Sequence, residues 1–211
     1  MSIIYRTAVG SLAAQVLIGA VTGMGFFVRV QDPDDARELH VILGLESGSQ
    51  LVEFLWYLVV VCRYTTVLTW TRYLDWVLST PVMLVSTTLF FAHRNDDFGA
   101  PFTGPYIYVT LGANWVMLLF GFLAETERIA RPAGLCLGFV AFAVSFTALA
   151  THVHDALSQA LFWFTFVVWA GYGVAAALPY TPKNVGYNAL DVVSKNFYGL
   201  FLFVYLFLTR A

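Results

Sequence analysis

Seven long apolar segments restrict this chain to a small set of folds. Each is about 22 to 27 residues long, and a helix rising about 1.5 Å per residue would then span a hydrocarbon layer of ~30 Å. Lipid offers no partners to backbone N–H and C=O groups, so such segments are predicted to be helices. The chain is therefore predicted to be an all-α membrane protein, a bundle of seven transmembrane helices. The segments cover residues 7–28, 37–62, 66–92, 103–124, 132–153, 156–178 and 186–209.

The connections between these segments carry turn chemistry. Residues 32–35 are predicted to form a turn, and residues 93–101 a polar loop with Gly and Pro. Residues 125–132 end one helix and start another, with Pro in a first turn. Residues 179–184 are predicted to be a turn-rich connector. All of these connections are too short for a further domain, so residues 1–211 are predicted to form one domain.

The composition supports an integral, multi-pass membrane protein surrounded by lipid. The chain is 59% hydrophobic and 11% charged, whereas soluble domains are about 25% charged. A net charge of −2 with no basic run argues against a nucleic-acid partner. Cys62 and Cys136 lack the spacing of metal ligands and are predicted to be buried thiols, so no metal site is expected. The first segment has no obvious cleavage site and is predicted to be a membrane helix.

The seventh segment contains two charges that are costly in a membrane. Asp191 and Lys195 are four residues apart, so a helix places them on one face with Cβ atoms about 5–6 Å apart. Ionisable residues in such a position need partners and mark a functional site by default.

The third segment supplies matching charges. Arg72 and Asp75 are three residues apart and can face each other, and Ser79 lies one turn further on the same face. Pro81 leaves a helix carbonyl free, which nearby Ser and Thr hydroxyls are expected to satisfy. Ser86 lies eleven residues beyond Asp75, about 16 Å along the helix.

Together, Arg72, Asp75, Asp191 and Lys195 sum to zero charge, as a site of low dielectric requires. One interpretation is a structural group of ion pairs that ties two helices together. The other is a reactive site, because a lysine amine desolvated in an apolar pocket suits Schiff-base chemistry.

Two further segments leave alternatives open. Glu46, Gln50 and Glu53 share one face of the second segment and are unlikely to face lipid. They form either a polar stripe that packs against helices or an oligomer partner, or a pathway for ions or protons. In the sixth segment, Trp169 and Tyr172 share a face that is either ordinary packing or the wall of a cofactor site.

The motifs carrying these residues strongly resemble those of the microbial (type 1) rhodopsins. The resemblance rests on residues 72–76 and 79–81 of the third segment and residues 190–195 of the seventh, with support from residues 112–117 and 169–172. It covers essentially the whole chain in the right order. The shortness of the chain and its acidic second segment are similar to the virus-encoded branch of that family.

The resemblance implies a site and an orientation. It implies all-trans-retinal bound to Lys195 as a protonated Schiff base, with Asp75 and Asp191 as counterions and Asp75 as first proton acceptor. It places Arg72 on the outer side, near the exit path, and the N-terminus outside; basic residues flank both membrane faces almost equally and do not decide this. The residues implied to surround the cofactor are Trp76, Thr80, Met83, Asn114, Met117, Gly121, Trp169 and Tyr172.

The chain departs from the best-known pump of that family in ways that favour slow reprotonation. Ser86 stands where that pump has a cytoplasmic donor carboxylate, and serine cannot donate a proton near neutral pH. Residues 179–188 contain no acid, so the usual pair of exit glutamates is missing. Gly173 replaces a proline of the sixth helix, and Asn114 replaces a common aspartate.

Three functions compatible with the resemblance remain open, none of them enzymatic. The first in rank is an outward proton pump; the second is a light-gated channel for protons or small cations along the face of Glu46 and Glu53; the third is a photosensor. A non-retinal transporter or structural bundle is the remaining alternative. Asp75 argues against a chloride pump, whose members replace that carboxylate. The family commonly forms rings, so a homo-oligomer, a trimer or pentamer, is expected.

Overall fold

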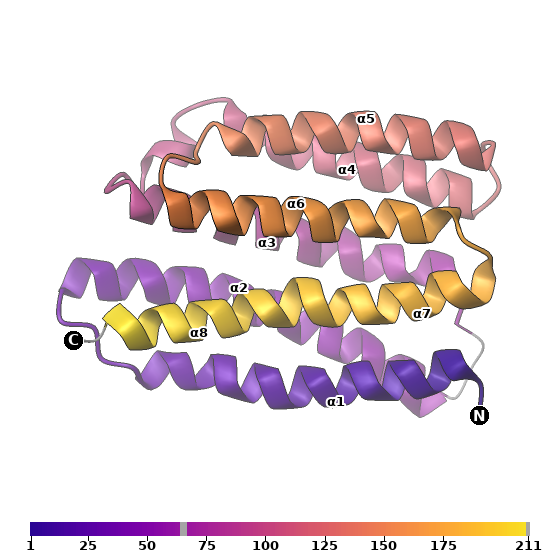
Figure 1. Ribbon diagram of the computed structural model, residues 1–211, viewed down its shortest axis with the longest axis horizontal. Coiled ribbons are helices and arrows are strands. Elements are labelled where there is room, and N and C mark those ends of the chain that lie inside the picture. The colour runs from indigo at the N-terminus through magenta and orange to yellow at the C-terminus, as the bar shows by residue number, and fades with distance from the viewer. Residues whose placement is uncertain (64–66, 210–211) are drawn as a thin grey trace.

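The chain folds into a bundle of long, roughly parallel and antiparallel helices (Figure 1). A computed structural model describes residues 1–63 and 67–209. Seven of its stretches are long and apolar enough to cross a membrane, which confirms the predicted all-α membrane fold. The first six crossings contain α1 (Ile3–Met24), α2 (Pro33–Arg63), α3 (Arg72–Arg94), α4 (Tyr106–Glu125), α5 (Arg131–Ala150) and α6 (Ala156–Ala177). The seventh consists of α7 (Tyr180–Asp191), a π-helical segment (Val192–Asn196) and α8 (Phe197–Thr209).

The bundle has two ends, defined here by the course of its helices. α1 and α7 begin at the end that we call the N-terminal end, and α8 finishes at the opposite, C-terminal end (Figure 1). Because consecutive crossings alternate in direction, α3 runs from the N-terminal to the C-terminal end, whereas α2 runs the other way.

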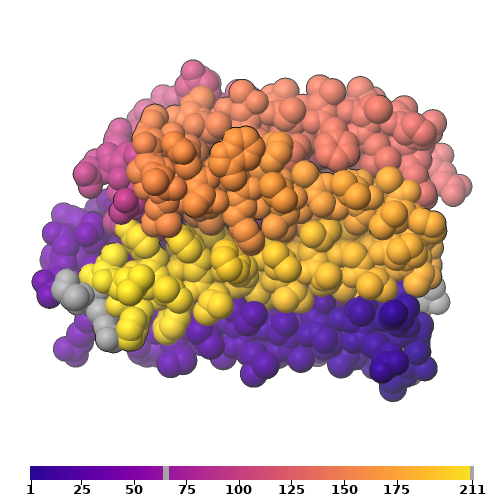
Figure 2. Space-filling view, viewed as in Figure 1, coloured from indigo at the N-terminus to yellow at the C-terminus, as the bar shows by residue number. Residues whose placement is uncertain are grey.

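The outer surface of the bundle is apolar, and many of its polar groups are inside. Leu17, Val140 and Val167 are more than half exposed, as expected for side chains that face lipid. Figure 2 shows the crossing formed end to end by α7 and α8 lying between α6 on one side and α1 on the other. The prediction that Cys62 and Cys136 are buried is wrong, since both are free and exposed. Apolar positions of a membrane helix can equally well face lipid.

Several helix boundaries differ from the prediction. The seventh crossing begins at Tyr180 rather than residue 186, so most of the predicted connector 179–184 is helix. Pro182 is compatible with this helix because it lies in the first turn, where a backbone N–H has no intrahelical partner. The predicted start of the third segment, residue 66, lies outside the described residues.

The second helix also begins earlier than predicted. α2 starts at Pro33 instead of residue 37, and residues 32–35 are a helix start rather than a separate turn. The Asp32 carboxylate accepts hydrogen bonds from the backbone N–H of Asp34 (2.8 Å) and Asp35 (3.2 Å), as an N-cap residue does. Proline fits the first helical position because its fixed φ is already helical.

Pro81 lies inside α3 and leaves the Val77 carbonyl without its usual partner. The prediction that a Ser or Thr hydroxyl donates to this carbonyl is wrong. The Trp115 indole Nε1 on α4 donates to this carbonyl at 3.4 Å, while the Thr80 hydroxyl donates to the Trp76 carbonyl at 2.7 Å. The proline thus creates a hydrogen bond between α3 and α4.

Candidate functional site

Lys195 lies at the centre of the bundle, inside the π-helical segment of the seventh crossing. Its side chain is almost fully buried, and Nζ donates a hydrogen bond of 2.7 Å to Asp75 Oδ2. A second carboxylate oxygen, Glu53 Oε1, lies 3.8 Å from the same nitrogen. The Gln50 amide donates to the Lys195 carbonyl at 3.3 Å. π-Helical turns are rare and occur frequently at functional sites, which fits the placement of this lysine.

Asp191 lies on the N-terminal side of Lys195 and is paired with Arg72, not with the lysine. Arg72 Nη1 is 3.0 Å from Asp191 Oδ2. The hydroxyls of Tyr57 and Tyr172 also donate to the Asp191 carboxylate, at 2.7 and 2.8 Å. The carboxylate therefore has one cation and two neutral donors, which is how a buried charge is stabilised.

The Arg72 guanidinium has a complete set of partners. Besides Asp191, it donates to the side-chain oxygens of Asn184 and Asn188 on α7. The Trp56 ring lies 4.6 Å from the guanidinium carbon, within range of a cation–π interaction.

The sequence prediction missed four of these partners. Asn184 and Asn188 had a usable signal, since they precede Asp191 and Lys195 at intervals of four, three and four residues along one helix face. Trp56 and Tyr57 had none, because an aromatic residue in an apolar run is usually packing.

Glu53 changes the charge balance of the site. The four groups predicted to sum to zero are joined by a third carboxyl, so Arg72 and Lys195 face Glu53, Asp75 and Asp191. An uncompensated charge in a buried site is expensive. Glu53 is fully buried, and apart from Lys195 its carboxyl has the neutral side chain of Gln15 as a hydrogen-bonding neighbour. We infer that Glu53 carries the proton that keeps the site neutral.

An apolar cavity meets Lys195 on the side away from α1 and α2. Its walls come from α3 to α7, and tryptophans 76 and 169 contribute aromatic faces. An amine that opens into such a cavity can condense with the aldehyde of a long apolar molecule. The lining residues that the sequence analysis had assigned to a cofactor are Lys195, Trp76, Thr80, Met83, Met117, Gly121, Trp169 and Tyr172.

Asn114 is the exception among the residues assigned to the cofactor. It does not line the cavity and donates to the Thr80 hydroxyl at 2.9 Å, so it holds a lining residue in place. The lining residues that the sequence analysis did not assign are Tyr73, Leu118, Gly134, Leu135, Gly138, Phe139, Phe142, Gly173, Ala176, Tyr187 and Ser194. Most of them are apolar and could not be distinguished from ordinary core residues.

The remaining predicted site residues lie along α2 and α3. Ser79 is fully buried, and its hydroxyl is a hydrogen-bonding neighbour of the Asp75 carboxylate. The Ser86 hydroxyl lies 3.3 Å from both the Ile42 carbonyl and the Tyr198 hydroxyl. Glu46 is also fully buried, but neither of its carboxyl oxygens has a partner.

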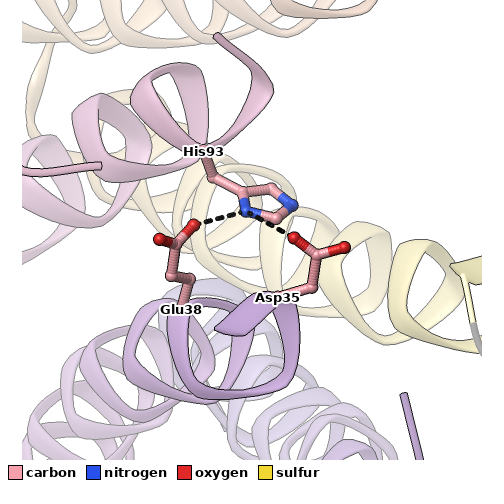
Figure 3. Close-up of side chains that lie close together, drawn as sticks. All are labelled: Asp35, Glu38 and His93. Carbon is pink, nitrogen blue, oxygen red and sulfur yellow. Dashed lines mark hydrogen bonds and ion pairs between the residues drawn. The ribbon is translucent and has the colours of Figure 1, made fainter. Parts of the chain in front are cut away.

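One group of described residues has the composition of a metal site. At the C-terminal end of the bundle, Asp35 and Glu38 of α2 point toward His93 of α3 (Figure 3). His93 Nδ1 is 2.8 Å from Glu38 Oε2 and 4.0 Å from Asp35 Oδ1. A hydrogen bond between histidine and glutamate accounts for this arrangement without a metal ion.

Comparisons with known proteins agree with these features. A family model described as "Bacteriorhodopsin-like protein" matches residues 7–209. The solved structure of viral rhodopsin OLPVRII has a TM-score of 0.87 at 28% identity, covering 97% of each chain. Two other solved structures share the fold. A blue light-absorbing proteorhodopsin from Med12 has a TM-score of 0.76 at 18% identity, covering 98% of this chain and 97% of that one. A thermophilic rhodopsin from Rubrobacter xylanophilus has a TM-score of 0.77 at 17% identity, covering 96% of this chain and 95% of that one. Comparison with curated proteins gives no match. This integral membrane protein therefore belongs to the bacteriorhodopsin-like family, the microbial rhodopsins, as its motifs predicted.

Proposed function

We propose that this protein is a light-driven outward proton pump in which Lys195 binds all-trans-retinal and Asp75 accepts the proton. The family implies a retinal chromophore. The residues fit such a group, because a single buried lysine amine meets an apolar cavity lined by Trp76, Trp169 and Tyr172. Bound retinal would supply a light-induced change of geometry at the Lys195 nitrogen.

The observation that carries the proposal is the 2.7 Å hydrogen bond between Lys195 Nζ and Asp75 Oδ2, two groups that are both buried. At this distance a proton can move directly between the two atoms. Ground-state pairing with Asp75 keeps the proton on nitrogen. Any change that weakens this pairing favours transfer to the carboxylate, because both groups then become neutral in a region of low dielectric.

The direction of transport follows from the position of Arg72. Arg72 lies one turn from Asp75 toward the N-terminal end and is linked to Asp191 and Tyr57. A proton that reaches Asp75 has this polar network on one side. If the N-terminal end faces outside, as we propose, the release is outward.

A second candidate function, a light-gated channel, is favoured by a different observation. Polar side chains with few partners are concentrated where α1, α2 and the seventh crossing meet. Gln15, Glu46, Glu53 and Asn196 are all buried there, and neither Glu46 nor Asn196 has a side-chain hydrogen bond among the described residues. Unpaired buried polar groups usually bind water. A hydrated seam of this kind would conduct ions if it opened at both ends.

Voltage-clamp recording under illumination distinguishes the two functions. A pump gives an outward current over a wide range of voltages and without an ion gradient. A channel current reverses near the equilibrium potential of its permeant ion. Outward current with identical solutions on both sides supports the pump, and reversal near that potential contradicts it. Glu46→Gln and Glu53→Gln in the same recording show whether the seam carries the current.

A further inference from the structure

Asn188 of α7 connects helix α1 to the arginine of the site. Asn188 is only 1% exposed. Its amide nitrogen donates to the Thr7 hydroxyl at 2.7 Å and to the Ile4 carbonyl at 3.2 Å, both in the first turns of α1. Its amide oxygen accepts a hydrogen bond from Arg72 Nη2. One buried carboxamide thus joins the start of α1 to the guanidinium.

The neighbours of this amide allow only one orientation. The Arg72 guanidinium can only donate hydrogen bonds, so the Asn188 atom that faces it must be the oxygen. The Ile4 carbonyl can only accept, so the atom that faces α1 must be the nitrogen. An amide turned by half a rotation would lose its bonds on both sides and leave buried polar groups unpaired. The position of the guanidinium is therefore coupled to the position of α1.

Arg72 has two short polar contacts, and both come from α7. Nη1 lies 3.0 Å from Asp191 Oδ2, and Nη2 donates to Asn188, one turn earlier in the same helix. The other hydrogen bonds of the guanidinium, to Asn184 and Tyr57, are longer, at 3.3 to 3.5 Å. Asp191 supplies the opposite charge, whereas Asn188 fixes the direction of the second nitrogen. Without Asn188, that nitrogen would keep only its 3.5 Å contact with the Asn184 carbonyl.

This connection lies at the N-terminal end of the seam between α1, α2 and the seventh crossing. Along α1, Thr7 precedes Gln15 by eight residues, which places it about 12 Å nearer that end. Along α2, which runs the other way, Tyr57 lies one turn beyond Glu53. Gln15 and Glu53 belong to the part of the seam with few partners, whereas the Tyr57 hydroxyl and the Asn188 amide are bonded. The sparse part of the seam therefore ends at a hydrogen-bonded layer.

A guanidinium fixed in this layer obstructs free cations. The rings of Trp56 and Tyr187 lie 4.6 and 5.5 Å from its central carbon, so aromatic faces flank the charge. A hydrated cation would have to displace Arg72 and would meet its positive charge, which is how a fixed arginine excludes cations from a pore. A proton that leaves Asp75 can instead pass between hydrogen-bonded groups. The seam would conduct cations only if the guanidinium moved away.

We propose that Asn188 is a positioning residue that locks Arg72 from helix α1 and so closes the seam to cations at its N-terminal end. The inference rests on the proposed function, because the lock is what makes the protein a pump and not the channel that an open seam would form. It also assigns a role to the first turns of α1: Ile4 and Thr7 act on the site through the Asn188 amide.

Nitrogen NMR of the arginine side chains tests the lock in the protein without retinal. In the wild type, the two Nη atoms of Arg72 should give separate signals, because the guanidinium cannot rotate. In Asn188→Ala the two signals should merge. Thr7→Val, which keeps the buried amide and removes its 2.7 Å bond to α1, should bring them closer together. Ser11→Ala is the matched control: its hydroxyl donates to the Asn188 backbone carbonyl at 2.9 Å, so the signals should stay separate. Separate signals in Asn188→Ala would overturn the lock.

Voltage-clamp recording under light tests the closure. In the wild type and in Ser11→Ala, an imposed sodium gradient should leave the light-driven current unchanged. In Asn188→Ala, a light-dependent current should appear whose reversal potential shifts with the sodium gradient, and Thr7→Val should show a smaller current of the same kind. A current that ignores sodium in both of these variants would overturn the closure. Failure of the pump itself is seen separately, as a wild-type current that reverses near an equilibrium potential, and the nitrogen spectra then still decide the lock.

Discussion

The two sides of Lys195 differ in whether their buried polar side chains have hydrogen-bond partners. Toward the N-terminal end, Arg72 and Asp191 are held by each other and by neighbouring tyrosine and asparagine side chains. Toward the C-terminal end, Glu46 is fully buried and neither of its carboxyl oxygens has a hydrogen-bond partner among the described residues. A permanent charge must be compensated where it is buried, whereas a neutral acid can remain alone. The fully bonded side suits fixed charges, and the sparse side suits acids in their neutral form.

The largest effect is expected at the nitrogen where the two sides meet. Lys195→Ala should abolish the visible absorption band that all-trans-retinal produces with the wild-type protein, because no other lysine is among the described residues that line the cavity. Lys183→Ala is the matched control, since Lys183 is the only other lysine of the chain and is also buried, in an ion pair with Glu125. A colourless wild type, or a coloured Lys195→Ala, would contradict the proposed site.

The next largest effect is a loss of stability, expected on the N-terminal side of Lys195, where the buried charges are hydrogen-bonded. Arg72→Gln should destabilise the protein by about 3–5 kcal/mol, because Asp191 is left as a buried charge without its cation. Equilibrium unfolding in detergent measures this loss. The control is Arg94→Gln, which removes a partly exposed ion pair with Asp155 (3.3 Å) and should cost about 0–1 kcal/mol. Similar losses in the two variants would mean that burial of the Arg72 pair has no special consequence.

These contrasts explain how much could be predicted from the sequence. Spacing along helices was enough to assign seven crossings and to place Lys195, Asp75, Asp191 and Arg72 together in the interior, because charges inside apolar segments must find one another. Spacing could not decide which cation pairs with which carboxylate. That choice depends on the rotation of neighbouring helices and on the π-helical turn. Neither can be deduced from the residue spacing within a single segment.

The same limit applies to Glu53 and to the early start of α7. Glu53 belonged to a face whose surroundings could not be known, and only packing shows that this face turns toward Lys195. Residues 179–184 contain two prolines and resemble a turn, but a proline in the first turn is also compatible with a helix. In both cases the local pattern allowed two structures and tertiary contacts selected one.

A third prediction concerns the close packing around Gln50. A Cβ atom on Gly199 would lie 2.7 Å from the Thr22 hydroxyl and still closer to the Gln50 amide. Gly199→Ala should therefore destabilise the protein by about 1–3 kcal/mol, and adding Gln50→Ala should recover part of the loss. Gly48→Ala is the control: it has open space around it and should be neutral or slightly stabilising. Thermal loss of the retinal band measures all three variants, and equal midpoints would refute the predicted clash.

The smallest effect is expected outside the membrane, at the start of α6. The Asp155 carboxylate caps this helix, accepting hydrogen bonds from Ser158 and from the backbone N–H of Leu157. Partial burial raises the pKa of Asp155, but these hydrogen bonds and Arg94 outweigh it and hold the pKa below its ordinary value. A depressed folded-state pKa stabilises the fold above the ordinary value, and this contribution disappears as the pH falls through the folded-state pKa.

Asp155→Ala should accordingly cost about 1 kcal/mol near neutral pH, the usual contribution of an N-cap. The difference from wild type should shrink in acid, once the wild-type carboxylate is protonated and no longer caps as an anion. Unfolding measured across this pH range in both proteins tests the sign, with the exposed loop variant Asp97→Ala as reference. A difference that stays constant into acid would show that the cap acts without its charge.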